Sequence, residues 1–284
     1  MTTLPGSRIG SKPGSPTRSA DRVERAAVVT HGRPEVIRDA VARLESVARD
    51  AGVELVVDGT DDGTNVDVAI VLGGDGTMLR ALQRFLGTGV PVFGVNFGRV
   101  GFLTSVHHSE LESGAARVFA GEHTVVELAT VEVRVGEEQA VAVNDVVATS
   151  ATLGRMVELA WAIGGEDLGT VPCDGMICST PSGSTAYNLS NGGPVLVWGL
   201  DAFTVTFVSP HSLHARPLVV PRSRAVEIWN RTPDVAATVL VDGHPLADLA
   251  SGESVGVRLG DRPALLAVFP EETFFKRYRE TFAS

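Results

Sequence analysis

The chain has 284 residues, of which 44% are hydrophobic and 20% are charged, a balance typical of a globular protein with a sizeable core. A formal net charge of −10 argues against general nucleic-acid binding, and no apolar run is long enough to span a bilayer. The two cysteines, Cys173 and Cys178, make neither a disulfide framework nor a metal quartet, so we expect a cytoplasmic protein.

The basic residues exclude two common kinds of phosphate site. Among the 24 basic side chains, only Lys12 and Lys276 are lysines. A Walker A loop requires Gly-Lys-Ser/Thr, and a protein kinase requires a lysine on an early strand, and neither is present. Any phosphate bound here would therefore be held by backbone amides, hydroxyl groups, metal or arginine.

The first part of the chain predicts a tail and then an α/β domain. Residues 1–21 are rich in Ser, Gly, Pro and Thr and lack an apolar h-region, which indicates a disordered tail rather than a secretory signal. Within 22–110, β-type runs alternate with helical periodicity, giving strands at 26–30, 54–57, 66–72 and 90–95 and helices at 35–49 and 78–85. This order predicts a Rossmann-like, doubly wound parallel sheet.

After about residue 120 the period changes from helical to alternating. Short strands are predicted at 125–135, 139–149, 156–163, 168–178, 203–208, 224–229, 236–242, 253–259 and 264–268. We therefore predict an all-β domain over 111–268, built as an antiparallel sandwich, and a C-terminal segment, 269–284, that returns to the α/β domain. The fold class is α/β followed by all-β.

The most informative loop is Gly73-Gly74-Asp75-Gly76-Thr77, between the strand at 66–72 and the helix at 78–85. Open α/β sheets bind ligands at this edge, and the glycines let a phosphate approach the backbone amides. A carboxylate would repel that phosphate unless it binds Mg²⁺ or accepts a proton from an attacking hydroxyl. The simpler alternative is that Asp75 only caps the helix.

Three further stretches are candidates for ligand contacts. Residues 96–103 form a second glycine-punctuated loop, and the pair Asn144-Asp145 interrupts an apolar run as either a bulge or a ligand-facing pair. In residues 174–194 a strand leads into a polar loop and a short helix, where Tyr187 could stack on a base and the hydroxyls could hold ribose or phosphate. The alternative there is a serine-capped surface helix.

In this order the motifs resemble those of the NAD kinase family, over nearly the whole chain beyond the tail. Diacylglycerol kinases, sphingosine kinases and phosphofructokinases share forms of the first motif, whereas the complete series is specific. The matching segments are 73–77, 96–103, Asn144-Asp145, Asp174-Gly175, 179–187, 209–213 and Asp242-Gly243.

The resemblance implies an enzyme that makes NADP from NAD. Asp75 would accept the proton of the 2′-hydroxyl of the adenosine ribose, which attacks the γ-phosphate of ATP or polyphosphate, with Mg²⁺ held mainly by the ATP phosphates. The family also implies a homodimer or homotetramer in which a neighbouring β domain completes the site. The implied binding residues are Gly74, Asp75, Gly76, Thr77, Arg80, Asn96, Phe102, Asn144, Asp145, Arg155, Asp174, Thr185, Ala186, Tyr187, Asn188, Leu189, Ser190 and His244.

Some positions depart from the family pattern, and two other functions stay open. Many members have Glu at Asp145, Gln at His244, Thr at Ser182 and a polar or basic residue near Pro172. A diacylglycerol-kinase-like lipid kinase would share the first loop, but the sequence shows neither a basic amphipathic helix nor an anchor. A catalytically silent NAD(P)-binding sensor is the other alternative, against which the retained Asp75 argues.

Overall fold

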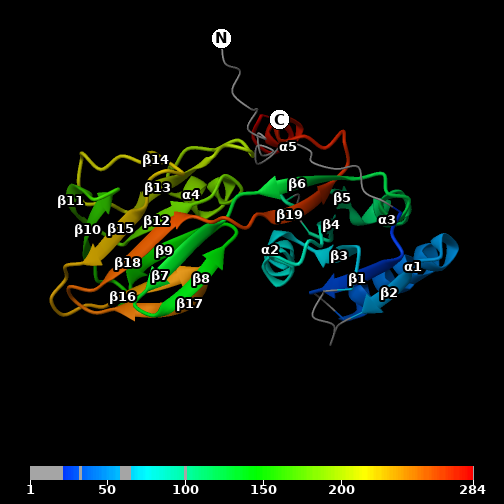
Figure 1. The fold of residues 1–284 in the computed structure, drawn as a ribbon, viewed down its shortest axis with the longest axis horizontal. Coiled ribbons are helices and arrows are strands. Elements are labelled where there is room, and N and C mark those ends of the chain that lie inside the picture. The colour runs from blue at the N-terminus through cyan, green and yellow to red at the C-terminus, as the bar shows by residue number, and fades with distance from the viewer. Residues whose placement is uncertain (1–21, 32–33, 58–64, 99–100, 284) are drawn as a thin grey trace, which may run out of the picture.

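The computed structural model describes residues 22–283 apart from 32–33, 58–64 and 99–100. The expected tail, as well as Arg99 and Val100 of the second loop, therefore lie outside the described residues. Figure 1 shows two domains side by side along the long axis, an α/β domain and a β domain. None of the described helices combines the length and the apolar content that a membrane crossing requires.

A seven-stranded, mostly parallel sheet with helices on both faces forms the α/β domain, as the alternating periodicity predicts. Its strand order is β2-β1-β3-β4-β19-β6, with β5 beside β4. The elements before the β domain are β1 (Arg25–Thr30), α1 (Pro34–Ala51), β2 (Glu54–Val57), β3 (Val68–Gly73), α2 (Asp75–Arg84), β4 (Val92–Asn96), β5 (Val106–His107), the 3₁₀ helix η1 (His108–Glu110), α3 (Leu111–Phe119) and β6 (Thr124–Leu128).

Strand β3 explains why the sheet is covered on both sides. Successive side chains of a strand point to opposite faces, so its unbroken apolar run fits a position between two layers of helices. Ala69 and Val71 pack in one core with residues of α2. Val68 and Ile70 pack in another with residues of α1 and α3. The strand ends at Gly73, and α2 starts two residues later at the sheet edge.

The pairing of β6 and of β19 (Ala264–Val268) differs from the predicted domain limits. Both strands lie in the parallel sheet, where β19 pairs with β4 through Leu266 and Val92 and pairs antiparallel with β6. Helix α3 packs with α1 in the same domain. The domain changes therefore fall between β6 and β7 and between β18 and β19, rather than at 110–111 and 268–269. Alternation predicts a strand but does not tell which sheet it joins.

Two six-stranded antiparallel sheets form the β domain, and a single hydrophobic core joins them, which confirms the predicted sandwich. The first sheet has the order β11-β10-β15-β18-β7-β8 and the second β14-β13-β12-β9-β16-β17. The strands are β7 (Val131–Val135), β8 (Glu138–Ala142), β9 (Asp145–Ser150), β10 (Val157–Ile163), β11 (Glu166–Cys173), β12 (Gly175–Ser179), β13 (Ala202–Val208), β14 (Leu218–Pro221), β15 (Val226–Asn230), β16 (Ala237–Val241), β17 (His244–Leu249) and β18 (Ser254–Leu259).

Besides the run at 125–135, which the structure divides between β6 and β7, two predicted strands are divided within the β domain. The run at 139–149 breaks before Asp145, where the chain passes from β8 in the first sheet to β9 in the second. The run at 168–178 breaks at Asp174 in the same way, between β11 and β12. Each break frees polar residues from the ladder at a crossing between sheets, which makes them available to a site.

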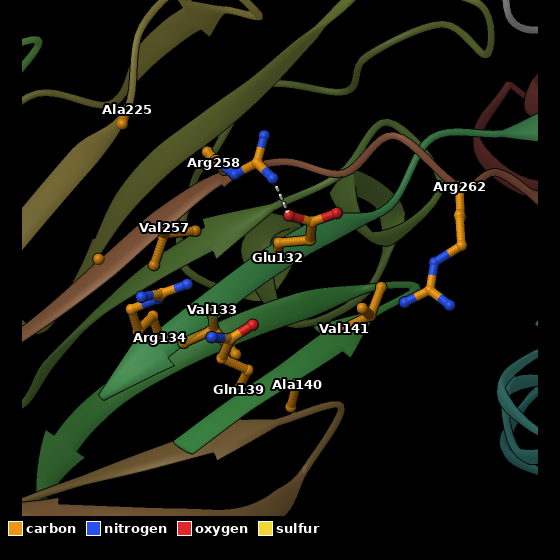
Figure 2. A pocket seen from close by; sticks show the side chains of 11 residues that line it. Glu132, Val133, Arg134, Gln139, Ala140, Val141, Ala225, Val257, Arg258 and Arg262 are labelled. Carbon is orange, nitrogen blue, oxygen red and sulfur yellow. Dashed lines mark hydrogen bonds and ion pairs between the residues drawn. The ribbon is translucent and has the colours of Figure 1, made fainter. Parts of the chain in front are cut away.

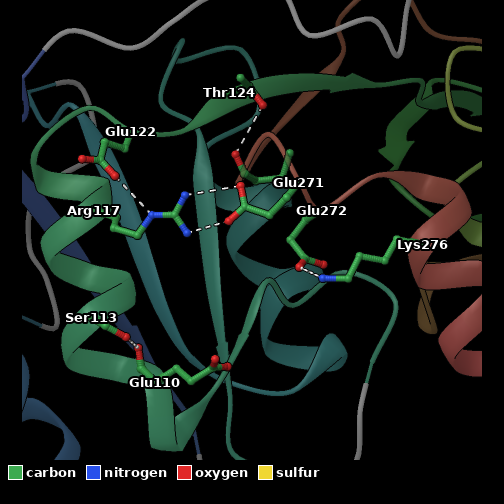
Figure 3. A network of polar contacts seen from close by, with 9 residues as sticks. Glu110, Ser113, Arg117, Glu122, Thr124, Glu271, Glu272 and Lys276 are labelled. Carbon is green, nitrogen blue, oxygen red and sulfur yellow. Dashed lines mark hydrogen bonds and ion pairs between the residues drawn. The ribbon is translucent and has the colours of Figure 1, made fainter.

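The chain ends in helix α5 (Phe274–Phe282), which packs back on the α/β domain. Figure 3 shows how the preceding segment is held: the Arg117 guanidinium on α3 donates to Glu271 at 2.6 and 3.3 Å and to Glu122 at 3.2 Å. An ion pair joins Lys276 to Glu272 one turn earlier. The Arg117 pairs are exposed and worth roughly 0–1 kcal/mol each, so their role is to fix the direction of the chain rather than to stabilise the fold.

Candidate active site

Asp75 is the first residue of α2, and its carboxylate holds a second loop. The Oδ2 atom accepts a hydrogen bond from the Phe102 amide at 2.7 Å, and Oδ1 accepts one from the Leu103 amide at 3.2 Å. The N-cap position belongs to Gly74, which makes no side-chain cap bond. The helix-cap interpretation of Asp75 therefore does not fit this geometry, because its bonds leave the helix and reach the 101–103 loop.

Gly101 permits this close approach. A Cβ atom built on Gly101 would lie 2.0 Å from the Asp75 Oδ1, well inside any real contact. The glycine pattern of the second loop thus has a steric reason: the backbone passes directly against the carboxylate. The two glycine-punctuated loops, separated in sequence, form one structural unit at the carboxyl edge of the parallel sheet.

Asp75 lines a cavity of about 290 Å³ between the two domains. Asn144, Ser182 and Thr185 enter this cavity from the β domain, and Thr281 and Phe282 enter it from the end of α5. The side-chain oxygen of Asn144 is buried and has no hydrogen-bond partner in the structure. An unsatisfied acceptor in a cavity wall costs free energy unless a ligand or water pairs with it, so it marks a binding surface.

A second cavity of about 380 Å³ adjoins the first, sharing Leu79, Asn144 and Ala186 with it. Its wall includes the Asp145 carboxyl and the Tyr187 ring, together with Asp242. The two cavities together place a carboxylate on a Gly-rich helix start beside an aromatic ring and two further acidic groups. Such an arrangement suits a ligand with phosphate, ribose and base parts.

Asp242 organises the boundary between the cavities, and sequence reasoning gave it no role. Its carboxylate accepts hydrogen bonds from the amides of Val143 and Asn144, both at 2.7 Å, and of Asp145 at 3.0 Å. It also accepts one from the Gln83 side chain on α2 at 2.7 Å, which ties the β domain to that helix. The break between β8 and β9 is thus held open by one side chain.

The sequence signal at Asp242 pointed elsewhere. Asp242 has φ +47° and Gly243 has φ +82°, the conformation of a two-residue hairpin turn, here between β16 and β17. Asp-Gly is a strong hairpin signal, so the turn alone accounts for the residue types. The four hydrogen bonds of the carboxylate show that the same aspartate serves the site.

Burial sets the ionisation of the two acidic groups. Asp145 is 6% exposed, and this burial, with the charge of Asp242 beside it, raises the pKa of Asp145 to about 7. Burial also raises the pKa of Asp242, although its bonds from the Val143, Asp145 and Asn144 amides and from Gln83 oppose the rise. The pair therefore retains protons at a pH where exposed carboxyl groups have lost theirs.

This shift predicts that the ligand-free protein becomes less stable as pH rises from about 4.5 to 7. The folded state holds the Asp145 proton up to about pH 7, whereas the unfolded chain releases it near pH 4, so stability falls as pH rises through that window. The full effect is at most about 4 kcal/mol. Asp145→Asn should remove most of the fall in thermal midpoint measured by calorimetry.

The comparison between variants isolates this effect. Burial lowers the pKa of His123, which opposes the trend below pH 6.5, but that contribution is common to both proteins. The pKa of Glu112 is lowered to about 2 by Arg43, so its contribution lies below the window. Equal pH slopes for the parent and Asp145→Asn would show that the Asp145 pKa is not raised.

The structure gathers the first group of predicted residues around these cavities. Gly76, Phe102, Asn144, Thr185 and Ala186 line the cavity with Asp75, and Asp145 and Tyr187 line its neighbour. Gly74 caps α2, and Thr77 is buried beneath the loop. The backbone amide of Phe102 donates a hydrogen bond to Asp75, while the Phe102 ring packs on Trp198 and Phe274 in the core.

Other predicted residues lie outside the walls of these two cavities. Asn188 is fully buried and its side chain bonds Ser184, Pro194 and Thr206. Leu189 and Ser190 continue the same turn, α4 (Tyr187–Ser190), of which only one face can meet a cavity. Asn96 accepts a hydrogen bond from the Gly98 amide and lines a different cavity. Arg80 is exposed, and its side chain bonds the Gly76 carbonyl. Three more predicted residues are also exposed: His244, Arg155 and Asp174.

The described residues contain no cluster of three or more His, Cys, Asp or Glu side chains able to hold a metal ion. Asp75 is the single carboxylate among the residues lining its cavity. The donor set therefore fits a divalent ion that arrives on a polyphosphate and takes at most one carboxylate from the protein.

A separate cavity of about 410 Å³ lies on the β7-β8-β18 sheet, away from every predicted residue. Figure 2 shows Arg134, Arg258 and Arg262 around it, with Arg258 paired to Glu132. Its walls come from the β domain alone, apart from Arg262 in the connection to β19. It contains none of the glycine-rich loops, so we place the active site at the domain boundary.

The fold and the site define a two-domain protein, an α/β domain and a β sandwich with a nucleotide-type site between them. Residues 34–123 match the model of the ATP-NAD kinase N-terminal domain, and residues 143–268 match that of the C-terminal domain. The chain belongs to the NAD kinase family. The predicted resemblance and fold class are thereby confirmed.

Individual relatives support this assignment. The chain is 42% identical over 220 residues to an NAD kinase of Heliobacterium modesticaldum, covering 76% of this chain and 78% of that one. It is 30% identical over 278 residues to an NAD kinase of Wolinella succinogenes, covering 92% and 96%. Neither a lipid kinase nor a silent sensor is supported by these matches.

Solved structures share the fold. An NAD kinase from Archaeoglobus fulgidus in complex with ATP is 28% identical, with a TM-score of 0.76, and the match covers 91% of this chain and 97% of that chain. Yeast NADH kinase complexed with NADH has a TM-score of 0.80 and covers 93% and 88%; at 23% identity it supports the fold.

Proposed function

We propose that this chain transfers the γ-phosphate of ATP to the 2′-hydroxyl of the adenosine ribose of NAD, giving NADP and ADP. The observation that carries the proposal is the position of Asp75. Its carboxylate lies on the Gly-rich start of α2 and lines a cavity between the two domains. The chain belongs to a family whose members are named NAD kinase.

Asp75 is the proposed proton acceptor. Each carboxylate oxygen has two acceptor positions, and one on each is taken by the Phe102 and Leu103 amides, so one remains on each for the ribose hydroxyl. The hydroxyl oxygen forms a bond to the γ-phosphorus while the bond from that phosphorus to the ADP oxygen breaks, and the hydroxyl proton passes to Asp75. Base assistance of this kind contributes roughly 10²–10⁴-fold.

The β domain is proposed to hold NAD. The unpaired side-chain oxygen of Asn144 can accept a hydrogen bond, and the Asp145 carboxyl can bond a ribose hydroxyl or an amide. Tyr187, which is half exposed at the mouth of its cavity, offers a ring for stacking. Thr185 and Ser182 complete a polar wall toward Asp75.

Magnesium is proposed to arrive on the ATP phosphates, where it would neutralise charge during transfer. The chain's own part would be to align the two substrates: backbone amides at the start of α2 would face the phosphates, and Asp75 would be available to the ion as well as to the hydroxyl. Polyphosphate in place of ATP would use the same amides.

We propose a homo-oligomer in which Arg155 and Asp174 serve the site of a neighbouring subunit. Leu153 and Leu213 are 103% and 87% exposed, an unusual state for large apolar side chains. Both lie at one end of the sandwich, since Val157 pairs with Cys173 and the His211 amide donates to the Pro172 carbonyl at 2.8 Å. Sedimentation equilibrium tests the assembly, and a monomer would contradict it.

The activity is tested with purified protein, ATP, Mg²⁺ and NAD, with NADP measured by an NADP-specific dehydrogenase. We expect NADP to form, and to stop forming when EDTA removes Mg²⁺. Diacylglycerol as acceptor should give no product, and polyphosphate in place of ATP shows which donor is used. NAD binding without NADP formation would mean that the chain is a sensor rather than a kinase.

A further inference from the structure

Helix α5 carries a buried arginine, Arg277, that is 4% exposed. Its Nη1 atom donates to the carbonyl of Phe102 at 3.0 Å and to that of Thr104 at 2.5 Å, and Nη2 contacts the Ser105 hydroxyl at 3.4 Å. The guanidinium also lies over the Trp198 ring, 5.6 Å from its centroid. All of its described hydrogen bonds therefore converge on residues 102–105.

The same short loop holds Asp75. The Phe102–Leu103 peptide unit has its carbonyl bonded to Arg277 and its N–H bonded to the Asp75 carboxylate. The preceding amide, of Phe102, makes the shorter bond to Asp75 at 2.7 Å. A positive group and a negative group thus bind opposite ends of one peptide dipole, which fixes the rotation of that peptide plane.

Stability alone does not account for this arrangement. Burial of a charge is costly, and the Nε atom of Arg277 is buried without a hydrogen-bond partner. An apolar side chain of similar volume often replaces a buried charge at no loss of stability. What an apolar residue would not supply is the planar fork, in which Nη1 donates to two carbonyls at once while Nη2 contacts the Ser105 hydroxyl, and which holds the loop in one conformation.

We propose that Arg277 is a positioning residue for phosphoryl transfer: it fixes the 102–105 loop so that the Phe102 and Leu103 amides hold the Asp75 carboxylate toward the reacting hydroxyl. The inference rests on the proposed role of Asp75 as proton acceptor. Arg277 lines neither of the two cavities of the site; it acts through the loop, from a helix that lies about 200 residues further along the chain than Asp75.

Arg277→Lys tests this. Lysine keeps the positive charge but loses the fork, so we expect kcat to fall about tenfold while the KM values for NAD and ATP change less than twofold. Arg279→Lys, the same change at an exposed position of the same helix, is the matched control and should leave kcat unchanged. A rise in both KM values with unchanged kcat would overturn the proposal.

A double-mutant cycle separates positioning from general stability. If Arg277 acts through Asp75, Arg277→Lys should lower kcat much less in an Asp75→Asn background than in the parent. An equal loss in both backgrounds would overturn the proposal, whereas near-normal kcat in Asp75→Asn alone would refute the role of Asp75 instead. If circular dichroism shows that Arg277→Lys is unfolded, Arg277→Gln takes its place. If neither variant folds, Arg277 is required for the stability of the fold, and the proposal is overturned.

Discussion

Asp75→Asn is expected to lower kcat by roughly two orders of magnitude or more, while NAD binding stays within a few-fold of the parent. The substitution keeps the shape of the side chain and removes both the proton acceptor and its charge. It also replaces one acceptor oxygen by an NH₂ group, so one of the two bonds from the Phe102 and Leu103 amides is lost. Steady-state kinetics and calorimetric titration with NAD measure the two quantities separately.

Asp67→Asn is the matched control for this experiment. Asp67 also accepts two backbone amides, from Glu24 at 2.8 Å and Arg25 at 2.9 Å, but it lies before β3, at the opposite end of that strand from Asp75. Both amides bond the same oxygen, Oδ2, so Asn can keep both bonds and the change removes only the charge; it should change stability slightly and leave kcat unaltered. If Asp75→Asn retained near-normal turnover, Asp75 would not be the base, and its part in the site would be limited to holding the loop.

The architecture was predictable because periodicity reports burial. The apolar run of β3 followed by glycines and a helical pattern is enough to place Asp75 at the carboxyl edge of a parallel sheet, which is where the structure has it. The alternating pattern after residue 120 likewise predicted a sandwich. The same alternation could not assign β6 and β19 to the parallel sheet. A strand with one buried face shows the same alternation of apolar and polar residues in either sheet.

The interruption of the apolar run at Asn144-Asp145 is explained by a distant residue, whereas the ligand contact stays a prediction. The chain changes sheet there, and Asp242 binds the amides of Val143, Asn144 and Asp145 in place of a strand partner. These contacts span 97–99 positions, and the contact of Arg277 with the Phe102 carbonyl spans 175. Local pattern carries no information on such pairs, so the residues that shape the site were less predictable than those that line it.

The segment Thr185–Ser190 illustrates the limit in the other direction. The resemblance assigned all six residues to binding, yet a helical turn presents only part of its surface to a cavity. Thr185, Ala186 and Tyr187 line the cavities, while the Asn188 amide is fully committed to Ser184, Pro194 and Thr206. We therefore expect Asn188 to support the loop rather than to contact NAD.

Asp145→Ala is expected to raise the KM for NAD roughly ten- to a hundredfold, the effect of losing one hydrogen bond to a buried charged group, and to leave the KM for ATP nearly unchanged. The reason is position. Asp145 opens into the cavity with Tyr187 on the β-domain side, whereas Asp75 and the start of α2 line the adjoining cavity. Steady-state kinetics with each substrate varied in turn measure the two constants.

Two features of the structure make this result interpretable. Removal of a buried carboxylate that repels Asp242 should not destabilise the protein, since Asp242 keeps its bonds from Gln83 and three backbone amides; an unchanged or higher thermal midpoint would exclude misfolding. Asp248→Ala, an exposed acid on β17 bonded to Thr238, is the matched control and should change neither constant. If Asp145→Ala instead raised the KM for ATP and left that for NAD untouched, the β domain would hold the phosphate donor, and the proposed division of the two substrates between the domains would be reversed.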